Sequence, residues 1–150
     1  MLMAPTLDQI LLAPDVQPNV VADCLTLIEQ EVSGKSGISG AAVKLAYRTA
    51  RTLAKGYLQS TVENLLPDFV AALEPYWSDF TVSGAAGFGD YLVKHGDEVA
   101  EALLSVTDAR AKMSERPVII KAYSTVRGGA AKHIIAALPA VGVLVEKYAS

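Results

Sequence analysis

The sequence has few of the residues that build catalytic or metal centres: one cysteine and two histidines among 150 residues. Cys24 alone can form neither an intramolecular disulfide nor a thiolate cluster, and a lone cysteine in a helical pattern is usually a small buried apolar side chain. His95 and His133 are far apart, and neither has a second ligand at the helical spacing of a metal site. No cofactor, metal or catalytic set is therefore predicted.

Long apolar runs are also missing. The longest, Ile134–Val145, contains Pro139 and is too short to cross a bilayer, so we expect a buried core helix there. The N-terminal residues lack the basic region of a secretory signal. These features predict a soluble, cytoplasmic protein without a membrane span.

Neither of the two nucleotide-binding patterns that the glycines suggest is complete. Gly34-Lys35-Ser36 resembles the end of a P-loop, but Glu29 stands where that motif needs its first glycine. A helical pattern also precedes it, where the motif needs a strand. The glycines of segment 84–89 do not follow a strand either, which excludes the dinucleotide fingerprint and leaves a loop.

The chain is rich in apolar residues, many of them alanine, and these residues recur with helical periodicity. Hydrophobic residues make up 51% of the sequence and charged residues 19%, and the formal net charge is −3. Alanine has the highest helix propensity and lets packed helices approach closely. This composition predicts an all-α fold, a compact bundle of about eight helices in a single domain over residues 1–150.

Helical periodicity runs through nearly the whole chain. A capping box at Thr6–Gln9 opens a short helix to about residue 12. Further helices are expected over residues 18–32, 39–55, 67–80, 90–94, 97–113 and 117–127, with Ser39 as an N-cap and a loop at 83–89. Pro67 either begins its helix or kinks one that started earlier, near the second capping-box pattern at Ser60–Glu63. The C-terminal stretch is expected as two helices divided at Pro139.

The halves on either side of the glycine-rich loop, residues 5–82 and 88–150, resemble each other in the same order. The matches are Asp8–Leu11 with Asp90–Val93, Val21–Leu25 with Val99–Leu103, Ala46–Arg51 with Ala122–Arg127, Leu66-Pro67 with Leu138-Pro139, and Leu73-Glu74 with Val145-Glu146. Chance matching of alanine- and leucine-rich helices is the alternative. The shared Ala-Tyr-x-Thr-x-Arg and Leu-Pro elements favour an internal duplication into two pseudo-symmetric multi-helix repeats.

The most ordered charge pattern is a basic stripe. Lys44, Arg48, Arg51 and Lys55 are spaced four, three and four apart and therefore share one face of the predicted helix. Such a stripe could contact phosphates or an acidic partner, although the solvated side of an amphipathic helix is the simpler interpretation. Nucleic-acid binding is disfavoured, because no aromatic residues are interleaved with the basic ones and the net charge is negative.

Aromatic residues are expected in the core. Tyr47 and Tyr123 occupy equivalent places in the two halves, and each is predicted to pack with its hydroxyl on a partner group. Trp77, close to Tyr76 and Phe80, is predicted to anchor the core at a helix end.

Segments 35–47 and 65–75 carry a resemblance to a known family. The first reads Lys-Ser-Gly-Ile-Ser-Gly followed by Val-Lys-x-Ala-Tyr, and the second Leu-Leu-Pro-x-Phe-Val-x-Ala-Leu-Glu-Pro. They resemble a family of small uncharacterised bacterial all-helical proteins, a domain of unknown function. The resemblance implies a helical fold and no activity.

Three functions remain open from the sequence. The leading hypothesis is a non-enzymatic binding or protein-interaction module with an apolar surface or an inter-repeat cavity. Its partner would be another protein, a second copy of the chain or a small apolar ligand. The second is an enzyme with an unrecognised site near His95 or His133. The third is contact with an anion or nucleic acid through the Lys44–Lys55 stripe.

Overall fold

The computed structural model describes residues 5–35, 37–53 and 56–149, which form eight helices and no strand. The helices are α1 (Leu7–Leu11), α2 (Gln17–Ser33), α3 (Gly37–Leu53), α4 (Tyr57–Ser83), α5 (Phe88–Lys94), α6 (Gly96–Lys112), α7 (Pro117–Arg127) and α8 (Ala130–Ala149). The predicted all-α class with about eight helices is confirmed.

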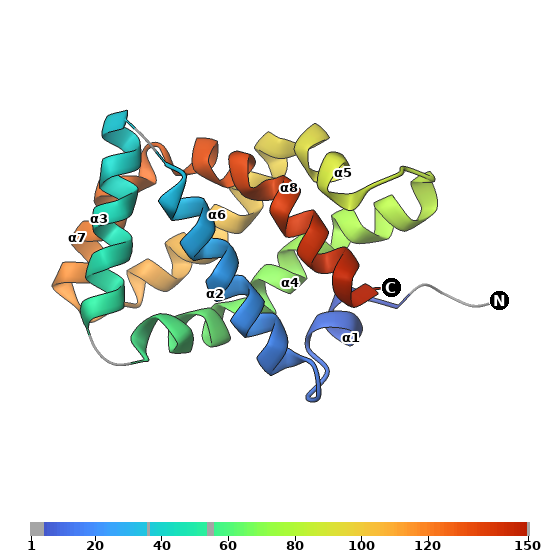
Figure 1. Ribbon diagram of the computed structural model, residues 1–150, viewed down its shortest axis with the longest axis horizontal. Coiled ribbons are helices and arrows are strands. Elements are labelled where there is room, and N and C mark those ends of the chain that lie inside the picture. Colours follow the sequence, from blue (N-terminus) through green and yellow to red (C-terminus); the bar gives the residue numbers. More distant parts are fainter. Residues whose placement is uncertain (1–4, 36, 54–55, 150) are drawn as a thin grey trace.

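The same order of helices occurs twice. The first half of the chain holds α1 to α4 and the second holds α5 to α8. In the first half, the short helix α1 and the helix α2 both pack against the long helix α4. In the second half, α5 and α6 pack in the same way against α8. The halves meet where α4 contacts α6, α2 contacts α8 and α3 contacts α7. The α3–α7 pair forms one end of the molecule, on the left of Figure 1.

The buried apolar core draws on both halves. Its members are Leu7, Leu11, Val20, Val21, Leu66, Val70, Leu73, Trp77, Phe88, Leu92, Val99, Leu138 and Val145. Among the described side chains, none of these core members lies on α3 or α7, so the described parts of these two helices pack at one end of the core without entering it. Trp77 is 7% exposed and donates its indole N–H to the carbonyl of Pro5 at 3.1 Å, which confirms its predicted role as a core anchor.

Both long helices continue through their prolines. α4 contains Pro67 and Pro75, so Pro67 lies inside a helix that starts earlier, and α8 contains Pro139. The expected division at Pro139 is wrong. A proline removes one helical hydrogen bond, and here packing compensates, because Leu138 and Val145 on either side of the expected break are buried against α5 and α6.

Only one of the three capping patterns in the sequence marks the start of a helix in the structure. At α1, the N–H of Thr6 donates to Oε1 of Gln9 at 3.0 Å, as the capping box requires. The prediction of Ser39 as an N-cap is wrong, since α3 begins at Gly37. The pattern beginning at Ser60 is also not a cap, because α4 begins at Tyr57 behind Gly56, whose φ of 76° only glycine adopts readily.

Two glutamates hold the short helices in place. A carboxylate oxygen of Glu74 on α4 accepts the N–H of Leu7 at 2.7 Å, and one of Glu146 on α8 accepts the N–H of Phe88 at 2.6 Å. Leu7 and Phe88 are the first residues of α1 and α5, so each carboxylate pairs an N–H that the helix leaves without an internal partner. The long helix of each half therefore fixes the short helix at its start.

No single helix among the described residues is both long enough and apolar enough to cross a membrane. Only α7 and α8 together reach the necessary length and hydropathy, and a bend of 85° separates them.

The closest helix packing lies between α5 and α8. A Cβ atom added to Gly142 would lie 2.1 Å from the backbone nitrogen of Gly89 and 2.2 Å from its Cα atom. A Cβ added to Gly89 would meet the carbonyl oxygen of Pro139 at 3.0 Å. The backbones of the two helices therefore touch, and only glycine at position 142 permits this crossing.

We therefore expect Gly142→Ala to lower the free energy of unfolding by about 2 kcal/mol or more, because backbone must move to admit the methyl group. Urea denaturation followed by circular dichroism measures the effect. Gly128→Ala is the matched control, since nothing lies within 4 Å of its added Cβ, and it should change stability by less than about 0.5 kcal/mol. Equal stability of the two variants would contradict the close crossing.

Candidate functional site

The basic stripe predicted from the sequence lies on α3. Arg48 and Arg51 are exposed and Lys44 is half-buried, while Lys55 lies outside the described residues. Within the described part of the chain, none of the first three forms an ion pair with a carboxylate. Their charges are therefore available to a partner.

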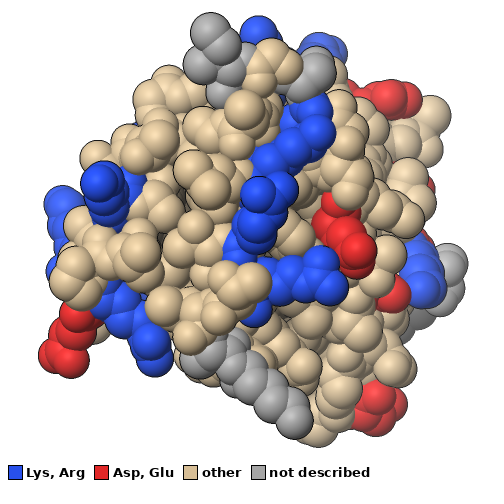
Figure 2. All heavy atoms as spheres, turned by 60° about the vertical axis from the view of Figure 1, so that its left-hand side comes forward, with Lys and Arg blue, Asp and Glu red and all other residues tan. Residues whose placement is uncertain are grey.

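Helix α7 extends this surface. It packs beside α3 and exposes Lys121, whereas Arg127 turns away to pair with Asp108 on α6. We use the name basic face for the outward sides of α3 and α7, with Lys44, Arg48, Arg51 and Lys121. Figure 2 looks onto this end of the molecule and shows Lys and Arg side chains running across it, with fewer Asp and Glu side chains among them.

Charge is strongly segregated along the chain. Residues 32–62 and 116–145 hold nine of the 13 Lys and Arg residues and none of the 16 Asp and Glu residues. These two segments contain α3 and α7. A chain with a net charge of −3 therefore has one basic end and an acidic remainder, an arrangement that orients an anionic partner toward the α3–α7 end.

Exposed aliphatic side chains accompany the basic ones. Leu45 on α3 is 60% exposed, and Val118 and Ile120 on α7 are 46% and 44% exposed. Apolar side chains of this size on an otherwise charged surface indicate contact with another molecule when they gather on one face.

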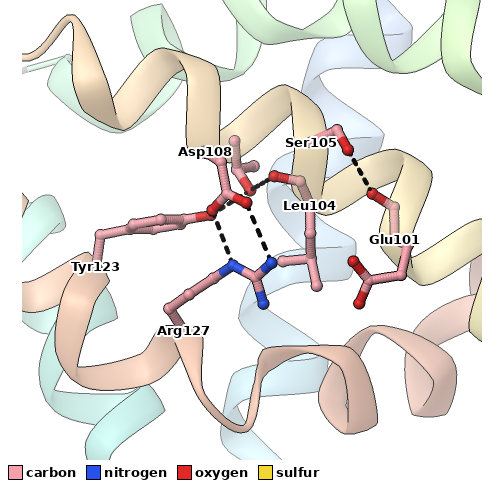
Figure 3. A network of polar contacts seen from close by, with 7 residues as sticks. Glu101, Leu104, Ser105, Asp108, Tyr123 and Arg127 are labelled. Atoms are coloured by element: carbon pink, nitrogen blue, oxygen red, sulfur yellow. Dashed lines mark hydrogen bonds and ion pairs between the residues drawn. The ribbon is translucent and has the colours of Figure 1, made fainter.

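A polar network fixes α7 to α6 (Figure 3). Arg127 donates from Nε to Oδ1 of Asp108 at 2.8 Å and from Nη2 to Oδ2 at 3.1 Å, a bidentate pair. The Tyr123 hydroxyl donates to the same Oδ1 atom at 2.5 Å and lies 2.7 Å from the hydroxyl of Thr107. The predicted hydrogen-bonded role of Tyr123 is therefore confirmed.

These contacts change the ionisation of the network. Hydrogen bonds from Arg127 and then Tyr123 lower the pKa of Asp108, although partial burial opposes them. The pKa of Tyr123 is raised, first by burial and then by its bond to Asp108. At neutral pH the network therefore holds a carboxylate, a guanidinium and a neutral phenol, with the opposite charges in contact.

A groove of about 740 Å3 lies between the two halves, where α4 of the first meets α6 and α7 of the second. It is lined by Tyr57, Ser60, Thr61, Asn64, Leu65, Thr107, Arg110, Ala111, Met113, Ser114, Glu115, Arg116, Ile119 and Tyr123. The hydroxyls of Tyr123 and Thr107 connect its wall to Asp108.

The two histidines lie apart from this groove. Nδ1 of His95 lies 3.6 Å from a carboxylate oxygen of Glu98, beyond hydrogen-bond length, beside a hollow of about 460 Å3 that also contains Asp97. The pKa of His133 is lowered, first by burial and then by the charges of Lys35 and Lys132. Among the described residues, no three His, Cys, Asp or Glu side chains converge on a common metal position.

The eight described helices place the chain in the class of small all-α proteins. The chain belongs to a family of unknown function, DUF6918, whose model matches residues 7–149. The resemblance to an uncharacterised helical family is thereby confirmed. Searches of curated proteins and of solved structures found no match to the chain.

The sequence predicts the α3 part of the basic face and raises an inter-repeat cavity as a hypothesis, but it gives neither the lining of the groove nor the Asp108 network. The groove joins residues more than 40 positions apart, such as Leu65 and Arg110, which helical periodicity cannot bring together. The charge segregation, by contrast, is visible in the sequence as two long segments without Asp or Glu.

The Asp108 network predicts a specific pH dependence of stability. Because the folded state holds the pKa of Asp108 below its ordinary 3.8, the network stabilises the fold above that value and is lost as the pH falls through the lowered pKa. Asp108→Asn should lower the free energy of unfolding at pH 7 and flatten its decrease between about pH 5 and pH 2. Urea denaturation across this range measures both effects.

The control is Asp68→Asn, at an exposed position on α4, which should leave the acid-induced decrease in the free energy of unfolding close to that of the unmodified protein. The same decrease in both variants would show that Asp108 is not responsible.

Proposed function

We propose that this protein is a binding module that holds an acidic protein surface against its basic face. The charge segregation carries the proposal, since nine of the 13 basic residues lie in two segments without an acidic residue. The packing of α3 on α7 supports it by placing these segments side by side. Lys44, Arg48 and Arg51 are the residues of the sequence-predicted stripe that take part, and Lys121 extends it.

The exposed aliphatic side chains favour a protein over a nucleic acid or a lipid surface. Protein interfaces combine an apolar centre with a polar and charged rim, which Leu45 and Ile120 among Arg48, Arg51 and Lys121 provide. Single-stranded nucleic-acid sites use aromatic side chains for stacking, and interfacial membrane helices use Trp or Phe as anchors. α3 and α7 contain neither Trp nor Phe.

We also propose that residues 5–82 and 88–150 are repeats within one domain over residues 1–150. The repeated order of helices supports this, as does the use of matching glutamates, Glu74 and Glu146, to hold α1 and α5. Under this alignment α3 and α7 are equivalent helices, so their packing sets two copies of one amphipathic element side by side.

The other hypotheses have less support. An enzyme site at His95 would need a base and a carboxylate in contact, and Glu98 is too distant for a hydrogen bond. A small apolar ligand would fit the size of the inter-repeat groove, but two arginines line that groove. The cytoplasmic location stays a prediction of the sequence.

A defined acidic polypeptide tests the proposed function. We expect a fluorescently labelled random copolymer of glutamate and leucine to bind at low ionic strength and to dissociate as salt rises from about 50 to 300 mM. Arg48→Glu/Arg51→Glu should weaken binding about tenfold or more, because it replaces two exposed cations by anions. Fluorescence anisotropy gives the dissociation constants.

The matched control is Lys94→Glu/Lys112→Glu, which changes the net charge equally at two exposed positions outside the basic face. It should weaken binding far less. Duplex DNA and vesicles containing phosphatidylserine are tested in parallel. Binding to either of them without binding to the copolymer, or equal weakening by both double variants, would overturn the proposal.

A further inference from the structure

The groove between α4, α6 and α7 has the size and lining of a small-molecule site. Its volume of about 740 Å3 falls in the range of ligand pockets, about 300 to 1,000 Å3. Leu65 and the Tyr57 ring on α4 and Ile119 and the Tyr123 ring on α7 provide apolar walls, and Ser60 and Thr61 add hydroxyls. It is separate from the basic face, so the inference below does not depend on the proposed function.

Two arginines line this groove without a carboxylate partner in the described part of the chain. The guanidinium carbon of Arg116 lies 5.2 Å from the centre of the Tyr57 ring, a cation–π contact that holds the side chain in place. Arg110 donates from Nη2 to the carbonyl of Asn64 at 3.2 Å. Each guanidinium has five N–H donors, so both keep donors for an anion.

Negative charge near the groove is limited. Glu115 is the one acidic residue in its lining. Asp108 lies behind Tyr123 and Thr107, and Arg127 pairs with both of its oxygens (Figure 3). The two arginines of the lining therefore outnumber its one acidic side chain, and the Asp108 carboxylate that contacts Tyr123 is paired with Arg127.

We propose that this groove binds a small organic anion with an apolar, preferably aromatic, body. The body packs between Leu65, Ile119 and the tyrosine rings, and its carboxylate or sulfonate accepts hydrogen bonds from Arg110 and Arg116. Guanidinium groups favour such planar or multi-oxygen anions because they donate two parallel hydrogen bonds. No covalent step is involved.

Two dyes of similar shape test the proposal on the full chain. Anilinonaphthalene sulfonate carries an anion on an aromatic body, and N-phenylnaphthylamine is its neutral analogue. We expect the sulfonate to bind with a stoichiometry of one and the neutral dye to bind at least about tenfold more weakly. Fluorescence titration gives the affinities, and isothermal titration calorimetry gives the stoichiometry.

Variants then assign the site. Arg110→Ala/Arg116→Ala should weaken sulfonate binding about tenfold and leave the neutral dye unchanged, whereas Lys94→Ala, at an exposed position on α5, should change neither. Ile119→Trp, which fills the groove, should abolish binding of both dyes. Cooperative thermal unfolding confirms that each variant is folded. Several weak sulfonate sites, or equal affinity for both dyes, would overturn the proposal. So would sulfonate binding that survives in both the double variant and Ile119→Trp.

Discussion

The fold depends on two carboxylate–amide bonds that join each short helix to the long helix of its half. α1 and α5 have five and seven residues, too few to be stable alone in water. Glu74 and Glu146 accept the first N–H of these helices, and the helices then bury Leu7, Leu11, Phe88 and Leu92 in the core. The long helices in turn owe part of their continuity to this packing, because α8 continues through Pro139 where it lies against α5. Short and long helices therefore stabilise each other.

The basic end has a different physical character. Among the described side chains, those of α3 and α7 do not enter the buried apolar core, and the two helices pack mainly on each other. Substitutions on their outward sides therefore cost little stability, so this surface tolerates a concentration of basic residues.

The fold class and most helices were predictable because helical periodicity and alanine content are local properties. The errors also have local causes. Pro139 predicts a helix break, but packing outweighs the lost hydrogen bond there. Ser39 and Ser60 have the chemistry of caps, but Gly37 and Gly56, both with φ of 76°, lie where their helices begin. The groove needed contacts between α4 and α6 that no local pattern records.

The proposed repeats differ at one position that matters for the charged surfaces. The match of Val21 with Val99 places Asp108 opposite Gln30, and the separate match of Ala46 with Ala122 places Arg127 opposite Arg51. The second half therefore pairs its arginine with a carboxylate and fixes Tyr123 as a wall of the groove. The first half has no carboxylate at the equivalent place, and Arg51 stays exposed. Under the proposed alignment, this one difference accounts for an arginine that is paired in the second half and exposed in the first.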